Sequence, residues 1–247
     1  SYMDKNYLFI SVTENIPMVK NIDVMIDPCG DMFSNSTNQV ILGTQNDKIS
    51  EQKSSYEMAV QLKEELESKG LRVELTRDKD GNPSYYGKNG RVGQAYRKNA
   101  KVFISLGIAY DEYISRPLIV VSPYTSGILA NNIASVSEEQ GLDLSNSYVM
   151  DNPFEVGVLF DPYIVKEEKE TKYEQYVQLR ESGGRLTYTG KEEHSKDNSR
   201  YSKSYGMYGI LYMYANIQSD ESVEYYKKNQ DKMVQGIAQG IYQYFIL

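Results

Sequence analysis

Residues 50–77 read SEQKSSYEMAVQLKEELESKGLRVELTR, a helical pattern followed directly by a strand pattern. Ser50 is a suitable N-cap, apolar side chains recur at three- and four-residue intervals, and Gly70 closes the helix. Upstream, apolar side chains alternate over residues 22–26 in a short strand that ends at Asp27-Pro28. A strand, a helix and a second strand in this order predict two parallel strands joined by a right-handed crossover.

Strand and helix patterns continue to alternate along the rest of the chain. We expect loops over residues 29–50 and 78–90, helices over 91–100, 126–139 and 219–245, and strands over 102–106, 118–121 and 209–214. This alternation is typical of an α/β domain, in which helices cover both faces of a mostly parallel mixed sheet. We therefore predict a single domain over residues 1–247, with an irregular, elaborated segment at 141–205 that carries charge-rich stretches at 166–172 and 191–200.

The composition is that of a globular protein with an acidic surface. Of 247 residues, 40% are hydrophobic and 25% charged, and the net charge is −7, which disfavours nucleic acid and anionic polymers such as teichoic acid as partners. Cys29 is the one cysteine, so no internal disulfide can form. We expect no membrane insertion, because no apolar run is long enough to span a bilayer. The sequence opens at Ser1, and we expect an upstream signal or anchor to be missing from it.

The sequence suggests roles for a group of tyrosines and for Arg77. The chain has 23 tyrosines, and several of them fall within residues 201–214. Strand alternation would bury some of these rings and leave others on an open face, where they could form a binding surface or simply pack. Arg77, at the end of its predicted strand, is expected to pair with a nearby acid such as Asp80.

The order of the motifs resembles that of the zinc-dependent N-acetylmuramoyl-L-alanine amidases, the amidase-3 type of cell-wall amidase. In that family the first strand ends in Ile-Asp-Pro-Gly-His-Gly-Gly and a glutamate opens the following helix. The matching residues here cover nearly the whole chain: Ile26-Asp27-Pro28-Cys29-Gly30-Asp31, Glu51, Leu75-Thr76-Arg77, Arg91, Asn99-Ala100, Phe103-Ile104-Ser105-Leu106 and Gly240-Ile241. The resemblance implies an amidase-like α/β fold and a role at the bacterial cell wall.

The same resemblance shows which functional residues are missing. The family holds zinc with two histidines and one glutamate, and a second glutamate moves the proton of the zinc-bound water. The two histidine positions are Gly30 and Gly107 here, the catalytic position is Met213, and Glu51 alone remains. Glycine has no side chain to donate to a metal and methionine cannot carry a proton. The resemblance therefore implies a degenerate member that binds no zinc and has no catalytic residue.

Alternative roles stay open for three residues. Cys29 could replace a lost histidine as a zinc ligand, with Asp27 and Asp31 nearby, or it could be a small buried thiol. Glu51 could be a vestigial ligand or could simply favour the dipole of its helix. His194, the one histidine, lies in a charged stretch and cannot rebuild a two-histidine site, so we interpret it as a surface residue.

Three hypotheses for function follow. The first is a catalytically inactive pseudoenzyme whose vestigial cleft, near Asp27, Cys29, Glu51, Gly107 and Met213, binds peptidoglycan fragments or a cell-wall or spore protein. The second is an active amidase with zinc in a rearranged site. The third is a structural or adhesive surface domain. Each of the three implies an extracellular or wall-associated protein.

Overall fold

The computed structural model describes residues 22–87, 89–110, 114–121, 127–145, 158–160, 164–166, 171–173, 176–183 and 207–246. His194, the charge-rich stretch 191–200 and residues 201–206 lie outside these ranges. The strands are β1 Val24–Pro28, β2 Met32–Ser34, β3 Gln39–Ile41, β4 Val73–Leu75, β5 Val102–Ala109, β6 Leu118–Val121, β7 Val158–Phe160, β8 Ile164–Lys166, β9 Thr171–Tyr173 and β10 Tyr208–Asn216. The helices are α1 Glu51–Ser68, α2 Arg91–Arg97, α3 Ile128–Glu139, α4 Val177–Gly183 and α6 Asp220–Ile246.

The main sheet has six strands in the order β4-β1-β5-β10-β6-β7. β1 is parallel to both β4 and β5, and β10 is parallel to β5. β6 runs antiparallel to β10 and parallel to β7, which makes the sheet mixed. The predicted parallel pairing on either side of α1 is therefore confirmed, and with it the mostly parallel mixed sheet.

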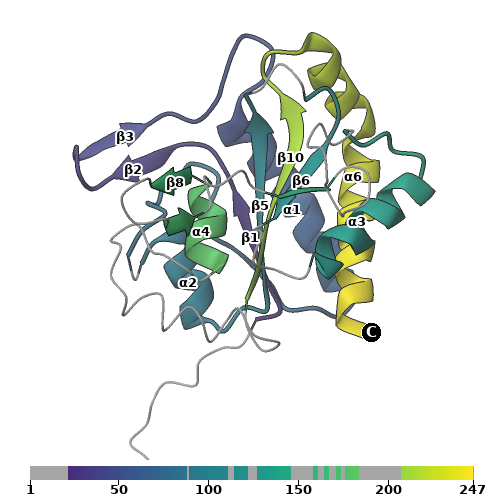
Figure 1. The fold of residues 1–247 in the computed structure, drawn as a ribbon, viewed down its shortest axis with the longest axis horizontal. Coiled ribbons are helices and arrows are strands. Elements are labelled where there is room, and N and C mark those ends of the chain that lie inside the picture. The colour runs from purple at the N-terminus through teal and green to yellow at the C-terminus, as the bar shows by residue number, and fades with distance from the viewer. Residues whose placement is uncertain are drawn as a thin grey trace, which may run out of the picture.

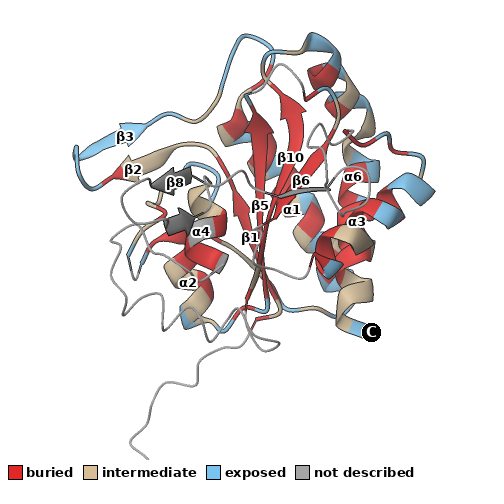
Figure 2. Cartoon of the chain, viewed as in Figure 1, coloured by how far each residue is buried: buried red, intermediate tan, exposed pale blue. Residues whose placement is uncertain are grey.

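Helices cover both faces of this sheet, as predicted (Figure 1). α1, α3 and α6 pack on one face, where side chains such as Ile104, Leu62 and Ile237 form the largest apolar core. α2 and α4 pack on the other face over two smaller cores, one around Phe103 and one around Leu211. Figure 2 shows the central strands buried between these two layers.

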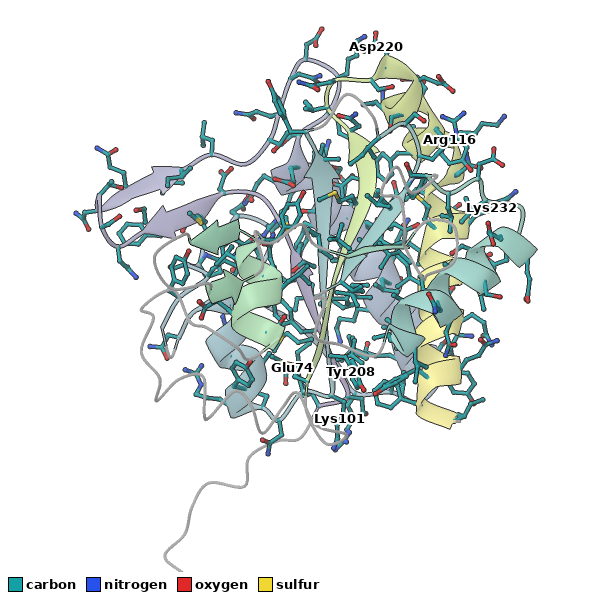
Figure 3. All side chains as sticks on the ribbon, in the orientation of Figure 1. Glu74, Lys101, Arg116, Tyr208, Asp220 and Lys232 are labelled. Atoms are coloured by element: carbon teal, nitrogen blue, oxygen red, sulfur yellow. The ribbon has the colours of Figure 1, made fainter. Side chains whose placement is uncertain are left out.

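The site positions lie at one end of the sheet. Lys101 and Tyr208, labelled in Figure 3, mark the opposite end, where β5 and β10 begin and the Tyr208 N–H donates to the Lys101 carbonyl at 2.8 Å. Asp220 lies at the other end, where β10 leads into α6. Ligand sites of open α/β sheets form at the carboxyl ends of parallel strands, so this is the end at which to look.

Several local predictions need correction. Residues 29–50, expected to be a loop, contain the antiparallel hairpin β2–β3. β5 continues to Ala109 rather than ending at Leu106, because β10 pairs with it as far as Asn216. Ser50 is the N-cap of α1, as predicted, but its side chain makes no capping hydrogen bond.

The expected open face of tyrosines is absent from the described part of residues 201–214. Tyr212 and Tyr214 are both fully buried in the core beneath α6, and the Tyr214 hydroxyl lies 2.7 Å from the Ser54 hydroxyl. Tyr208 is half-buried and packs edge-on against Tyr244. These rings are packing elements, and the hypothesis of a binding surface on this strand is wrong for them. No helix in the described ranges combines the length and apolarity needed to cross a membrane.

Candidate functional site

The ends of β1 and β5 bring together the positions that the resemblance singled out. Cys29 follows β1 and its N–H donates to the Leu106 carbonyl at 2.9 Å, while Gly107 on β5 pairs with Met213 on β10. A methyl group built at Gly107 would lie 3.2 Å from Glu51 Oε1 and 3.3 Å from Cys29 Sγ. The space beside Gly107 is thus bounded by the two residues with ligand-type side chains.

Glu51, the first residue of α1, uses its buried carboxylate to hold two other segments of backbone. The residue is 8% exposed, Oε1 accepts the Ile108 N–H at 2.8 Å, and Oε2 accepts the Thr44 N–H at 3.1 Å. Burial raises the pKa of Glu51, and the two N–H donors offset part of that rise. Both oxygens therefore help to position the β5 end and the segment before α1, a role that the sequence did not predict beside the vestigial-ligand and helix-dipole roles it left open.

Gly30, which the resemblance assigns to the family's first histidine position, has no room for a side chain. Its φ of +136° is unfavourable for other residues, and a Cβ would lie 2.3 Å from Gln52 Oε1 and 2.7 Å from Gln52 Cα. Gln52 holds this approach in place, because its Oε1 accepts the Asp31 N–H at 2.8 Å. The backbone here is built around a glycine, and a histidine at this position would require it to move.

Cys29 is a buried thiol with polar neighbours. It is 3% exposed, the Tyr85 hydroxyl donates to Sγ at 3.5 Å, and Gln178 Nε2 donates to Sγ at 3.6 Å. Burial raises the pKa of the thiol far above its usual range, and the negative charges of Asp27 and Glu51 raise it further. The free thiol is therefore protonated at physiological pH, and it would have to lose this proton to bind a metal.

The residues present do not fit a zinc centre. Asp27 is bound to other side chains, and Asp31 Oδ1 accepts the Gly43 N–H at 2.9 Å. Within the described ranges, no three histidine, cysteine, aspartate or glutamate side chains are grouped so that they could hold a metal ion. Cys29 and Glu51 would supply two donors, fewer than the three protein ligands of a catalytic zinc site.

A fully buried ion pair fixes the end of β1. Asp27 and Arg91 are both 0% exposed, with Arg91 Nη1 donating to Asp27 Oδ1 at 3.1 Å. The Thr76 hydroxyl donates to Oδ1 at 2.6 Å and the Ser105 hydroxyl to Oδ2 at 2.9 Å. We did not pair Asp27 with Arg91 from the sequence. A buried aspartate at a strand end is normally paired with a cation, and this rule is the signal that could have identified the pair from the sequence.

Arg77 does not pair with Asp80, its predicted partner. Its guanidinium donates to backbone carbonyls, at 2.8 Å each to Pro28, Cys29 and Gln52, and also to Asp78 and Lys79. No ion pair with Asp80 is formed, because these backbone carbonyls accept the hydrogen bonds of the guanidinium instead. Arg91 completes the arrangement by donating to the carbonyls of Pro28 and Asp31.

Met213, which the resemblance assigns to the family's catalytic glutamate position, lies in an apolar cluster. Met213 is 4% exposed and packs with Cys29, Ala109, Ile114, Leu118, Val120, Leu179 and Leu211. Leu179 belongs to α4, within the segment 141–205 that the sequence left without a structural assignment. α4 thus adds both an apolar side chain beside Met213 and, through Gln178, a hydrogen bond to Cys29.

The arrangement offers little acid–base chemistry. The Tyr85 hydroxyl is neutral, because burial raises its pKa well above the usual value. The site therefore combines a carboxylate whose oxygens are both engaged, a neutral thiol and a neutral phenol around an apolar centre. Of these groups Glu51 alone could accept a proton, because each carboxylate oxygen keeps a second lone pair.

Comparison with known proteins supports the fold. No family model and no curated protein matches the chain. Among solved structures, it is similar to the catalytic domain of CwlV, an N-acetylmuramoyl-L-alanine amidase from Bacillus (Paenibacillus) polymyxa var. colistinus, with a TM-score of 0.56 and 16% identity over 91% of this chain and 98% of that one. The amidase AmiC2 of Nostoc punctiforme gives a TM-score of 0.53 and 17% identity over 92% and 98%.

A third structure extends the likeness to another bacterial group. The apo form of the amidase Ami1 from Mycobacterium abscessus gives a TM-score of 0.51 and 12% identity, covering 91% of this chain and 98% of that one. Identities this low establish architecture, and the architecture agrees with the order of motifs in the sequence. The chain has the fold of the N-acetylmuramoyl-L-alanine amidase catalytic domain.

Proposed function

We propose that this protein is an amidase-fold component of the bacterial cell wall that no longer cleaves peptidoglycan. The carrying observation is the donor set: beside Gly107 the described ranges place two ligand-type side chains, Glu51 and Cys29, one fewer than a catalytic zinc site needs. The Glu51 carboxylate also accepts a backbone N–H on each oxygen and so positions the backbone around it. The closed backbone at Gly30 and the apolar surroundings of Met213 support the same proposal.

The retained fold would then serve for binding. We propose a peptidoglycan fragment, or a protein of the wall or spore, as the ligand, and a location outside the cell or on its wall. Support comes from the amidase fold and from the acidic net charge of −7, which suits neither nucleic acid nor teichoic acid. A structural or adhesive surface domain is the alternative that needs no wall ligand.

An active amidase with a rearranged site has one observation in its favour. Glu51 Oε1 and Cys29 Sγ both border the same point beside Gly107, at 3.2 and 3.3 Å from where a Cβ on that residue would lie. A metal there would need at least one further ligand and a deprotonated thiol. These requirements make it the second candidate, and it predicts that activity depends on Cys29.

The decisive assay is release of peptide stems from purified peptidoglycan in the presence of added zinc. We expect no new L-alanine amino termini above the level of a heat-denatured control. Zinc-dependent release that Cys29→Ala abolishes would contradict the proposal and support the rearranged site. Glu64→Ala, at an exposed position on α1, is a matched control that leaves the site intact.

Binding is tested separately by co-sedimentation with insoluble peptidoglycan. Saturable co-sedimentation without peptide release is the expected result. A protein that stays in the supernatant would favour a protein partner or a structural role over a peptidoglycan ligand. The two assays therefore distinguish loss of catalysis from loss of ligand binding.

A further inference from the structure

The β2–β3 hairpin projects from the body of the domain, and its outer strand is unusually apolar (Figure 1). All three residues of β3 are exposed, and Figure 2 shows the whole strand in the colour of exposed residues. Val40, Ile41 and Leu42 have exposed fractions of 44%, 47% and 62%. Consecutive exposed aliphatic side chains on a strand are typical of an interaction surface.

The hairpin can gain a strand on one side only. On the β2 side, the Phe33 N–H donates to the Asn82 carbonyl at 2.7 Å and the Asp31 N–H donates to Gln52 Oε1 at 2.8 Å. On the β3 side, β2 is the one neighbouring strand within the described ranges. Among the described residues, the outer edge of β3 is thus the open edge of this two-stranded sheet. Hairpins of two strands gain stability when further strands join them.

The hydrogen-bond pattern shows which residue faces this edge. Phe33 pairs with Val40, and its N–H points away from β3 toward Asn82. In an antiparallel pair, both residues of such a non-hydrogen-bonded pair direct their N–H and C=O groups outward. The N–H and C=O of Val40 therefore point to the open edge, where a second strand could exchange two hydrogen bonds with them.

We propose that β3 pairs antiparallel with β3 of a second copy of this chain, with Val40 opposite Val40 of that copy. The two-fold axis would pass between these residues, each Val40 would exchange two backbone hydrogen bonds with its counterpart, and Gln39 would face Ile41 of the other copy. The result is a four-stranded sheet in the order β2-β3-β3-β2. Phe33 and Val40, which share one face, would form an apolar row across all four strands.

The lack of charge at this edge suits a second copy as the occupant. The chain carries a net charge of −7, so two copies repel each other over most of their surfaces. Residues 32–46 contain no Asp, Glu, Lys or Arg, although 25% of the chain is charged. An uncharged, protruding edge lets two acidic molecules meet without placing like charges opposite each other. This inference does not depend on whether the candidate site is catalytic.

The test measures the self-association of the wild type and of two charge variants of the full chain by sedimentation equilibrium. The wild type should show a monomer–dimer equilibrium between 28.3 kDa and twice that mass. Val40→Lys and Val40→Asp should each weaken dimerisation at least about tenfold, because like charges would lie opposite each other across the axis. An equimolar mixture of the two variants should dimerise again, since lysine would then face aspartate.

Ile128→Lys is the matched control, because Ile128 is an aliphatic residue on α3 with a similar exposed fraction of 53%. It should dimerise as the wild type does. A wild type that remains monomeric, or a Val40→Lys variant that dimerises normally, would overturn the proposal. Monomeric single variants whose mixture also stays monomeric would overturn the pairing of Val40 with its own counterpart.

Discussion

Replacing Asp27 with asparagine should test how the end of β1 is held, because it removes one charge and keeps the shape. Asp27 and Arg91 are both fully buried, and the aspartate accepts hydrogen bonds from Arg91, Thr76 and Ser105. In the variant, the Thr76 hydroxyl can still donate to the amide oxygen, and the Ser105 hydroxyl can rotate to accept from the amide nitrogen. The main loss is therefore the charge that neutralises Arg91.

The magnitude follows from the burial of the pair. Removing one partner of a buried ion pair costs about 3–5 kcal/mol, because the other charge is left buried without compensation. With a urea m-value of about 3 kcal/mol/M, the unfolding midpoint of Asp27→Asn should fall by about 1–2 M. Arg91 keeps its bonds to the carbonyls of Pro28 and Asp31, which favours the lower part of that range.

Urea unfolding followed by circular dichroism measures this loss, and the chain provides a matched control. Asp23 forms an ion pair with Arg72 at 2.9 Å, but the Arg72 side chain is 58% exposed. Asp23→Asn should therefore cost no more than about 1 kcal/mol. If Asp27→Asn were no more destabilising than Asp23→Asn, the buried pair would not be what holds this segment. The double variant Asp27→Leu/Arg91→Met should recover much of the lost stability, because it removes both charges.

Three further predictions concern the candidate site. The folded-state pKa of Glu51 is raised above 4.5, so as pH increases through that pKa the wild type must lose stability relative to Glu51→Gln. Urea unfolding at several pH values should show the cost of Glu51→Gln shrinking with rising pH, and a constant cost would contradict the shift. Gly30→Ala should lower the unfolding free energy by about 1–3 kcal/mol more than Gly107→Ala, because its φ is +136° and its Cβ would meet Gln52 at 2.3 Å. Equal losses in urea would show that the backbone at Gly30 is not constrained. Cys29 should react with a disulfide reagent only as fast as the protein opens, because its thiol is buried and its pKa raised. A native rate close to that of the urea-unfolded chain would refute this.

The fold was predictable because local pattern and global architecture agree. Each strand predicted from alternation lies in the main sheet, and the apolar faces of the predicted helices pack on it, apart from Ile128 at the start of α3, which is exposed. The ends of strands were harder to predict where pairing between strands continues beyond the apolar pattern in the sequence. Gly107 interrupts the apolar run in β5, yet β10 provides a partner strand that carries β5 on to Ala109.

The site could be located from the sequence but not described. The resemblance assigned Gly30, Gly107 and Met213 to the positions of the family's histidines and catalytic glutamate. What surrounds these positions depends on contacts between residues far apart in the chain, such as Gln178 with Cys29 and Arg77 with the carbonyls that follow β1. No periodicity in sequence reports such contacts, because they form only when the sheet brings the segments together.

Zinc content is the direct test of whether this amidase fold has lost its metal centre. The protein should be purified without chelator, dialysed first against zinc and then against zinc-free buffer, and analysed for metal by elemental analysis. We expect far less than one zinc per chain, with no change in Cys29→Ala or Glu51→Gln. About one retained zinc per chain, lost in either variant, would contradict the loss of the metal centre.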